Sequence, residues 1–325
     1  MKKIKILIPV YNDWESVFKL LENINSEIST LSHEFSVIIV NDSSTEKRPE
    51  KLLNLDNLKS IQILNIKENQ GHARCNATGL KYIFEKEEFD YVIPMDGDGE
   101  DSPEEIKQLI DNLNYHPVKP IVGERIKRSE GIFFKFCYLV HKIITYTFTG
   151  EIIKYGNYSC LPKSTVAEMI NEKATWSSFS GSLAKVAKHK VGVPSERGSR
   201  YFGPSKMTFK NLIIHSLSII SVFKMNVLIR SILFLAVYMF LIHQNITLIM
   251  LIPFMLIFVL IASVFTVSKR ESLDELSNSL SSISSIELKI SIPPPYCCAV
   301  LLSICESDIL TIELWSIKTP PPLIP

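Results

Sequence analysis

YVIPMDGDGEDSPEE, residues 91–105, joins a buried strand, an acidic turn and a helix start. The apolar run Tyr91–Met95 predicts a strand that is covered on both faces. Ser102 then supplies an N-cap, Pro103 a proline at the first helical position, and two glutamates the acids of a first turn, so a helix is expected from about residue 103. A strand that leads directly into a helix is the repeating unit of an α/β fold.

The same alternation of strand and helix recurs towards the N-terminus. Continuous apolar runs predict buried strands at Ile4–Val10, Phe35–Val40 and Ile61–Ile66, with helical patterns at about Trp14–Ile28 and Ala73–Phe84. We therefore expect an α/β domain with a Rossmann-like, mainly parallel sheet covered on both faces. In such sheets ligands bind at the carboxyl ends of the strands, so the polar residues after each strand are the place to look for chemistry.

Polar residues follow all four predicted strands. These segments are Pro9-Val10-Tyr11-Asn12-Asp13, Val40-Asn41-Asp42-Ser43-Ser44-Thr45, Glu68-Asn69-Gln70-Gly71 and Met95-Asp96-Gly97-Asp98-Gly99-Glu100. Their carboxylates are expected to converge on one cleft. Asp, Asn and Ser are also ordinary turn residues, and for Asn41 and Ser43 this simpler interpretation is at least as good as a functional one.

The last of these segments predicts a metal site. Asp96, Asp98 and Glu100 stand at alternate positions beside glycines, where they repel one another unless a cation or donor group offsets the charge. Hard oxygen ligands of this kind suit Mg²⁺ or Mn²⁺, with a substrate diphosphate completing the shell. An EF-hand does not fit, because Lys107 stands where that loop requires a glutamate.

Composition separates a mixed globular part from an apolar part. The 325 residues include 35 Lys or Arg and 34 Asp or Glu, and the resulting net charge of +1 does not support a nucleic-acid binder. Hydrophobic residues make up 46% of the chain and concentrate between about Asn211 and Val267, so intrinsic disorder and a purely soluble enzyme are poor interpretations. The six cysteines form neither a CxxC pair nor a disulfide framework, which fits a reducing compartment.

Four motifs in strand order resemble glycosyltransferase family 2 with a GT-A fold: IPVYND, VNDSST, the NQG turn and MDGDGEDSPEE. The resemblance covers residues 3–206 and implies a GT-A domain over residues 1–207 that binds a UDP- or GDP-linked sugar. The donor-binding residues it implies are Pro9, Tyr11, Asp13, Asp42, Gly71, Asp96 and Asp98, with Asp42 on the base. It also implies that Asp96 and Asp98, with Glu100 as a further ligand, hold Mg²⁺ or Mn²⁺ against the donor diphosphate.

Basic motifs in the second half resemble the polyprenyl-phosphate (dolichyl- or undecaprenyl-phosphate) sugar transferases of that family. Gly123-Glu124-Arg125 with Arg128 is similar to their G-x-R segment, and RYFGPSK, residues 200–206, to their R-x-x-G-x-S-K loop. Arginine suits phosphate because its planar fork donates two hydrogen bonds, although for Lys206 an anionic lipid surface is an equal alternative. The acceptor-phosphate residues implied are Arg125, Arg128, Arg200, Ser205 and Lys206, and the catalytic residues are Asp98, Arg125, Arg128 and Arg200.

The acceptor stays open on sequence grounds. Gly156-Asn157-Tyr158-Ser159-Cys160 stands where this branch has G-D-F-R-L, and no QxxRW motif of processive synthases is present. The segment Trp176–Ser180 holds no acid to serve as the base that a sugar hydroxyl requires. A phosphate monoester is already anionic near neutral pH, so a missing base fits a phosphate acceptor.

The prediction is therefore a metal-dependent inverting transferase that moves a sugar to a polyprenyl phosphate. One alternative is the same fold acting on a hydroxyl of a lipid-linked saccharide in envelope polysaccharide synthesis. The other is a non-catalytic nucleotide-sugar-binding scaffold in the membrane. A homo-oligomer is compatible with the sequence.

The C-terminal half predicts membrane attachment. Residues 208–225 are apolar on one face and predict an interfacial amphipathic helix. Residues 226–267 contain two apolar segments around a short polar break, which predict a transmembrane hairpin, with a buried helix pair as the alternative. Arg230 lies near the start of the first segment, where its side chain is expected to snorkel to the interface. Residues 268–325 are of low complexity and are expected to form a poorly ordered tail.

Charge placement predicts the orientation in the membrane. Lys224 and Arg230 precede the hairpin, and Lys269 and Arg270 follow it, so both ends are expected on the cytoplasmic side. The N-terminal apolar run stops at Val10 without a cleavage site, so it does not predict a signal peptide. We expect a multi-pass protein of the cell (inner) membrane with a cytoplasmic catalytic domain.

Overall fold

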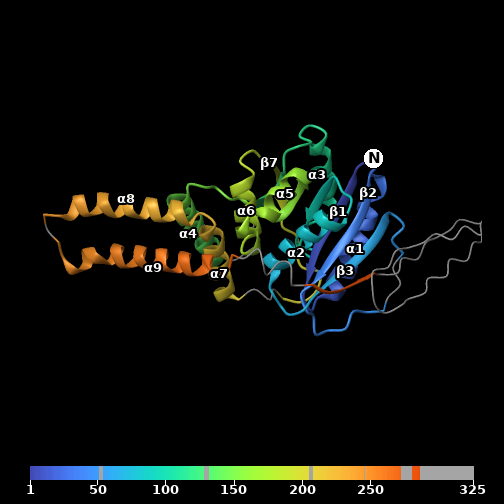
Figure 1. Cartoon of the computed structure of the whole chain (residues 1–325), viewed down its shortest axis with the longest axis horizontal. Helices are drawn as coiled ribbons and strands as arrows, with labels where there is room; N and C mark the ends of the chain where they lie inside the picture. The colour runs from blue at the N-terminus through green and yellow to red at the C-terminus, as the bar shows by residue number, and fades with distance from the viewer. Residues whose placement is uncertain (51–53, 128–131, 205–207, 245, 272–279, 286–325) are drawn as a thin grey trace, which may run out of the picture. The chain divides into compact units, whose positions relative to one another are not determined.

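The computed structural model describes residues 1–50, 54–127, 132–204, 208–244, 246–271 and 280–285 (Figure 1). The chain divides into two units, residues 1–291 and 292–325. All the described residues belong to the first unit.

A mixed sheet in the order β7-β5-β6-β4-β1-β2-β3-β8 forms the centre of the first unit. β1 pairs in parallel with β2 and β4, β2 with β3, and β5 with β7, whereas β6 and β8 are antiparallel to their neighbours. The mainly parallel sheet predicted from the sequence is thus confirmed. The strands are β1 (Lys3–Val10), β2 (Glu34–Asn41), β3 (Leu58–Ile66), β4 (Tyr91–Pro94), β5 (Ile121–Lys127), β6 (Tyr155–Pro162), β7 (Val191–Glu196) and β8 (Leu280–Ser285).

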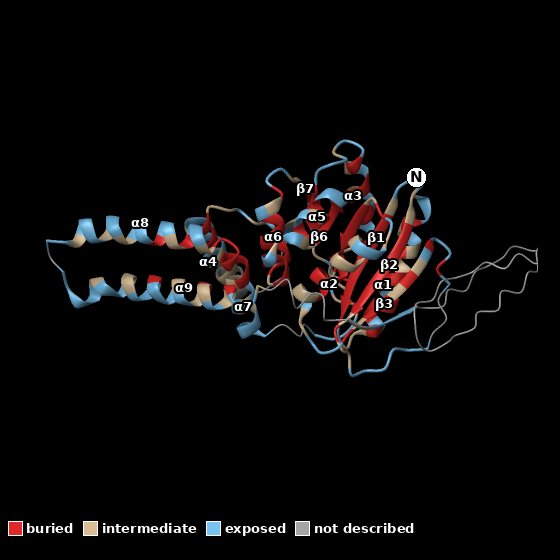
Figure 2. Ribbon diagram, viewed as in Figure 1, coloured by how far each residue is buried: buried red, intermediate tan, exposed pale blue. Residues whose placement is uncertain are grey.

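Helices cover both faces of the sheet, and the strands are buried between them (Figure 2). β1 shows why, because successive side chains of a strand point to opposite faces. Ile6 and Ile8 join the apolar core under α1 and α3, whereas Leu7 joins the core under α2, α5 and α6. The helices are α1 (Trp14–Glu27), α2 (His72–Lys86), α3 (Ile106–Leu113), α4 (Ile132–Thr149), α5 (Lys163–Asn171), α6 (Phe179–Val186), α7 (Phe209–Ser221), α8 (Lys224–Ile242) and α9 (Ile252–Ser268).

The helix predicted after the acidic turn begins where expected, but with a tighter turn. Pro103–Glu105 form a 3₁₀ turn, and α3 continues from Ile106. The hydroxyl of Ser102 donates to the Glu104 carboxylate and does not cap a backbone N–H. The proline and the acids of the first turn therefore mark this helix start more reliably than the serine does.

Two long apolar helices follow α7 in the chain. Lys224–Ile242 and Leu248–Ser268 are long and apolar enough to cross a membrane, and 11% of each hydrophobic window is buried inside the protein. A helix pair in the core of a soluble protein would be mostly buried, so this exposure disfavours that alternative. α7, predicted as an interfacial helix, packs against α9 and α4.

α4 is absent from the sequence-based prediction, and its C-terminal end supplies the hydrogen-bond partner of Arg230. Arg230 Nη1 donates to the carbonyl of Thr147 at 3.2 Å, and Asn226 Nδ2 donates to that of Thr149 at 3.1 Å. Both carbonyls lie in the last turn of α4, where no intrahelical donor exists. Arg230 thus binds the C-terminal end of a neighbouring helix, where a positive charge also opposes the helix dipole.

The expected tail is in part a strand. Residues 280–285 form β8, which extends the sheet antiparallel to β3, and Asn65 Nδ2 donates to Ser282 Oγ at 3.0 Å. The outer edge of β3 offers unpaired backbone groups, and a strand of modest propensity can pair with them. Residues 272–279 and 286–325, the rest of the expected tail, lie outside the described residues.

Candidate active site

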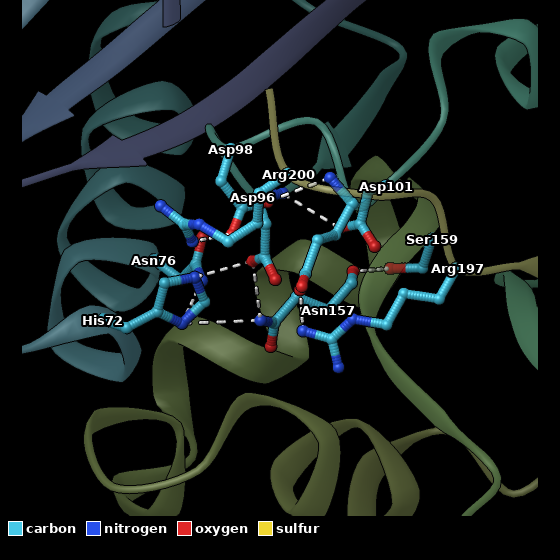
Figure 3. A network of polar contacts seen from close by, with 10 residues as sticks. His72, Asn76, Asp96, Asp98, Asp101, Asn157, Ser159, Arg197 and Arg200 are labelled. Carbon is cyan, nitrogen blue, oxygen red and sulfur yellow. Dashed lines mark hydrogen bonds and ion pairs between the residues drawn. The ribbon is translucent and has the colours of Figure 1, made fainter. Parts of the chain in front are cut away.

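The acidic turn after β4 is the centre of a polar network at the carboxyl end of the sheet (Figure 3). Asp96, Asp98 and Asp101 come from the turn itself. The other labelled members come from α2 (His72 and Asn76), β6 (Asn157 and Ser159) and the segment after β7 (Arg197 and Arg200). Parallel β1 and β4 end at this edge, and antiparallel β6 begins there, so segments far apart in sequence meet at one place.

Asp96 is held as a carboxylate by His72. His72 Nε2 lies 2.8 Å from Asp96 Oδ1, and Asn157 Nδ2 donates to the same oxygen at 3.4 Å. Burial alone would raise the pKa of Asp96, but the charge and hydrogen bond of His72, together with Arg125, hold that pKa well below its usual range. Burial would likewise lower the pKa of His72, and the charge and hydrogen bond of Asp96 outweigh it and raise that pKa.

Asp98 is bound by an arginine that also reaches the end of β1. Arg200 Nη1 lies 2.5 Å from Asp98 Oδ2, and Arg200 Nη2 lies 2.6 Å from Asp13 Oδ2. Burial and the neighbouring Asp96 nevertheless raise the pKa of Asp98 to about 6. The same two causes raise the pKa of Asp101 to about 8, and Asp101 Oδ2 accepts a hydrogen bond from the Asp96 N–H at 2.9 Å.

The predicted set of three metal ligands is not assembled. Within the described residues, no three His, Cys, Asp or Glu side chains are grouped so that they could hold a metal ion. Glu100 pairs with Arg197 instead, so a different cation offsets its charge. Asp96 and Asp98 do fit two oxygen ligands of a hard cation, because their mutual repulsion is not fully offset by the neighbouring side chains.

The segment that carries Arg197 and Arg200 lies directly on the acidic turn. The Gly198 N–H donates to the Glu100 carbonyl, and the Tyr201 N–H donates to the Asp98 carbonyl, both at 2.9 Å. The Tyr201 ring covers Gly99, where an added Cβ would lie 2.5 Å from Tyr201 Cε2. The R-x-x-G-x-S-K resemblance predicts Arg200 beside the acceptor phosphate, and no motif in the sequence indicates Arg197 or Tyr201.

Of the two remaining predicted arginines, the structure describes Arg125 and does not describe Arg128. Arg125, on β5, lies against β6, because a Cβ on Gly156 would be 2.9 Å from Arg125 Nη2. Its charge also lowers the pKa of Asp96, so Arg125 belongs to the network around the acidic turn. Arg128, Ser205 and Lys206 lie outside the described residues.

The predicted donor residues at the other strand ends have mixed environments. Pro9 is buried in β1, and Tyr11 just beyond it is 43% exposed. Gly71 has a φ of +88° and is the N-cap residue of α2. Asn41 makes a turn, because its Oδ1 accepts from the Ser44 N–H at 3.0 Å, so the simpler interpretation holds for this residue.

Asp42 shapes the loop that leads into α2. It is 4% exposed; its Oδ1 accepts from the Gln70 N–H at 2.7 Å and its Oδ2 from the Gly71 N–H at 2.9 Å. Both carboxylate oxygens thus bind the backbone. The predicted contact of Asp42 with the nucleotide base stays a prediction.

Asp42→Ala is expected to destabilise the protein, because it leaves the Gln70 and Gly71 N–H groups without their acceptor. Losing charge-assisted bonds from partly buried donors costs about 2 kcal/mol or more. The free energy of unfolding of the detergent-solubilised protein checks this, with Asp42→Asn, which keeps one acceptor oxygen, as the matched variant. Unchanged stability in Asp42→Ala would contradict the structural role.

Comparison with known proteins identifies the family of this chain. The family model described as Glycosyl transferase family 2 matches residues 5–172, just over half of the chain. The undecaprenyl-phosphate 4-deoxy-4-formamido-L-arabinose transferase of Klebsiella pneumoniae (strain 342) is 26% identical over 222 residues, covering 66% of this chain. The match spans 65% of that relative, slightly less than two thirds of its length.

Two solved structures are similar at lower identity. Glucosyl-3-phosphoglycerate synthase from Mycobacterium tuberculosis, with Mn²⁺, UDP and glucosyl-3-phosphoglycerate, has a TM-score of 0.47 at 12% identity, covering 69% of this chain and 80% of that one. S. aureus TarS 1-349 with UDP-GlcNAc has a TM-score of 0.46 at 14% identity, covering 84% and 83%. The match to the family model carries the assignment: this chain belongs to glycosyl transferase family 2, and its mainly parallel sheet is the GT-A catalytic fold of that family.

Proposed function

We propose that this protein is a membrane-attached, inverting glycosyltransferase that moves a sugar from a UDP- or GDP-linked donor to a polyprenyl phosphate. The observation that carries the proposal is the meeting of two carboxylates, Asp96 and Asp98, with two guanidinium groups, Arg125 and Arg200, at the carboxyl end of the sheet. The carboxylates suit the cation of a nucleotide-sugar diphosphate, and the guanidinium groups suit the phosphate of an acceptor. The Klebsiella pneumoniae relative, by its name, acts on undecaprenyl phosphate.

The donor half of the site is built by the ends of β1 and β4. Asp96 and Asp98 would hold Mg²⁺ or Mn²⁺, which neutralises the charge of a diphosphate leaving group when bound. His72 keeps the Asp96 carboxylate ionised and fixes its orientation through the 2.8 Å contact. Tyr11, exposed just beyond β1, lines the same edge for the nucleotide.

The acceptor half needs cations and no base. A phosphate oxygen is already anionic, so it can attack the anomeric carbon without losing a proton to the protein. The new bond joins this oxygen to the anomeric carbon as the bond from that carbon to the donor diphosphate breaks on the opposite face, which inverts the configuration. Arg125 and Arg200 orient the phosphate, and the segment Trp176–Ser180 holds no acid that would serve a hydroxyl acceptor.

Membrane attachment would bring this site to the lipid surface. α8 and α9 expose apolar side chains along their length, and α4, fixed to α8, adds exposed Leu139, Ile143 and Tyr146. β8 follows α9 and pairs with β3, so the chain after the hairpin returns to the side of the catalytic domain. With basic residues at both ends of the hairpin, that side is the cytoplasmic one in our proposal.

Sugar transfer by membranes that carry the full chain tests the proposal. A labelled panel of UDP- and GDP-sugars is offered with polyprenyl phosphate and Mn²⁺ or Mg²⁺. Label is expected in an organic-extractable lipid monophosphate, and EDTA is expected to abolish it until excess Mn²⁺ or Mg²⁺ is added back. Label in a lipid-linked saccharide would favour the hydroxyl acceptor, and absence of any donor turnover would favour the scaffold. Transfer at full rate in EDTA would contradict the metal assignment.

A further inference from the structure

Arg200 binds the donor carboxylates although its loop is the one assigned to the acceptor. Its guanidinium bridges Asp13, just after β1, and Asp98 in the acidic turn, at 2.6 Å and 2.5 Å. All three side chains are largely enclosed, with 16% of the Arg200 side chain exposed. Charge-assisted pairs of this geometry are among the stronger contacts in proteins, so Arg200 is a specific partner of the donor site.

The contacts of Arg200 oppose two other contacts. Both Asp98 oxygens already have partners, because Oδ1 accepts from the Glu100 N–H at 3.0 Å and Oδ2 from Arg200 Nη1 at 2.5 Å, so a divalent cation would approach Asp98 against the charge of the guanidinium. The guanidinium uses one Nη–H on each carboxylate, and this bridge directs the fork and its charge towards Asp13 and Asp98 and not towards a phosphate. A donor cation and the arginine therefore compete for Asp98, and a phosphate and the carboxylates compete for the arginine.

The surrounding backbone allows the side chain to exchange partners without moving the loop. The loop is fixed to the acidic turn by the N–H groups of Gly198 and Tyr201, and neither bond involves the Arg200 side chain. Arg200 Nε is buried and has no hydrogen-bond partner within the described residues. Three of the five guanidinium N–H groups, the Nε–H and one on each Nη, are thus not used by the two ion pairs, and a phosphate could accept from the Nε–H together with an Nη–H.

We infer that Arg200 couples the two substrates: the donor with its cation takes Asp98 from Arg200, and the released guanidinium then binds the acceptor phosphate. This inference rests on the proposed function and adds an order to it, donor first and acceptor second. Coupling between two ligands is reciprocal, so each substrate raises the affinity of the other by the same factor, typically about 5- to 150-fold.

Mn²⁺ binding to the full-length protein in detergent tests the first step without any turnover. Free Mn²⁺ is followed by its electron paramagnetic resonance signal in a titration of wild type, Arg200→Gln and Arg200→Lys. Arg200→Gln is expected to bind Mn²⁺ about tenfold more tightly, because Asp98 loses its competing cation, whereas Arg200→Lys keeps a competing charge and stays near wild type. Arg270→Gln is the matched control: it removes the same charge from an exposed position after α9 and is expected to leave Mn²⁺ affinity unchanged.

A short-chain isoprenyl phosphate tests the second step by calorimetry, with and without Mn²⁺ and UDP or GDP. Wild type is expected to bind it about tenfold more tightly when Mn²⁺ and the nucleotide are present, and Arg200→Gln is expected to lose this enhancement.

Equal or weaker Mn²⁺ binding in Arg200→Gln would overturn the competition for Asp98. An affinity for isoprenyl phosphate that is the same with and without Mn²⁺ and nucleotide would overturn the coupling and leave the proposed function intact. No isoprenyl phosphate binding in any mixture, beside normal Mn²⁺ and nucleotide binding, would overturn the proposed acceptor and the coupling with it.

Discussion

Asp98→Asn is expected to abolish sugar transfer and, at the same time, to make the protein more stable at about pH 7.5. Transfer is lost because the variant gives up a charged oxygen ligand for the donor cation, an effect we expect to exceed about a thousandfold. Stability rises because burial and Asp96 raise the pKa of Asp98 to about 6, from 3.8 in the unfolded chain. A carboxyl group with a raised pKa opposes folding when it is ionised, and the amide removes that charge.

Because folding raises the pKa of Asp98, the stability gained by Asp98→Asn depends on pH. The folded protein holds the Asp98 proton more tightly than the unfolded chain does, so the stability from this group is complete below about pH 3.8 and is lost as the pH rises through about 6. The advantage of Asp98→Asn is therefore expected to be near zero at about pH 4 and to reach at most about 3 kcal/mol above pH 6.

Thermal unfolding of wild type and Asp98→Asn in EDTA, at about pH 4 and at about pH 7.5, measures this difference in stability. Asp111→Asn, an exposed position on α3, makes the same charge change outside the site and is expected to show no such pH dependence. An Asp98→Asn protein that is less stable than wild type at about pH 7.5 would mean that the Arg200 ion pair outweighs burial and repulsion.

The order of elements around the acidic turn could be predicted because local sequence determines it. Tyr91–Met95 and Ile4–Val10 are apolar runs too short for helices and bounded by turn residues, and both form central parallel strands. The site was located by the same reasoning, since chemistry in a parallel sheet lies at the strand ends. Their position after a strand predicts Asp96 and Asp98, whereas Arg200 is predicted only through the resemblance of its loop to R-x-x-G-x-S-K.

The partners within the site could not be predicted, because they are set by contacts between distant segments. His72 meets Asp96 across 24 positions, and Arg197 meets Glu100 across 97. Neither residue stands in a pattern that indicates chemistry by itself. A motif indicates the carboxylate but not the cation beside it: Glu100 is predicted as a metal ligand, and in the structure Arg197 is its partner.

Among the elements that the sequence-based prediction lacks, β8 and α4 depend on remote segments of the chain. β8 is a serine-rich segment with weak strand propensity, and it is a strand because the edge of β3 supplies the hydrogen-bond partners. α4 ends at Thr149, where Arg230 and Asn226, on α8, bind its last carbonyls. In both cases a remote part of the chain stabilises the element, and a local pattern carries little information about it.

Gly99→Ala is expected to be far more damaging than Gly71→Ala, although both glycines have a positive φ. Their φ angles are +89° and +88°, a range that L side chains rarely adopt, so alanine is strained at both positions, at about 1–3 kcal/mol. At Gly71 an added Cβ meets nothing within 4 Å, whereas at Gly99 it would lie 2.5 Å from the Tyr201 ring. Displacing a packed ring adds about 1–3 kcal/mol.

The displaced ring should also disturb the site. Tyr201 is held by Asn23 Nδ2, which donates to its hydroxyl at 2.8 Å, and by its own N–H on the Asp98 carbonyl. Moving Tyr201 therefore shifts the neighbouring Arg200, and Gly99→Ala is expected to lose sugar transfer as well as stability.

A double-mutant cycle separates the ring from the backbone. If the ring carries the extra cost, Tyr201→Ala makes room for the new Cβ, so Gly99→Ala costs about 1–3 kcal/mol less in that background than in wild type. Unfolding free energies of Gly99→Ala, Tyr201→Ala, the double variant and Gly71→Ala give the coupling directly. Equal losses at the two glycines, with no coupling to Tyr201, would show that the ring does not rest on the acidic turn in solution, and the segment that carries Arg200 would then lack the support from which its place in the site is argued.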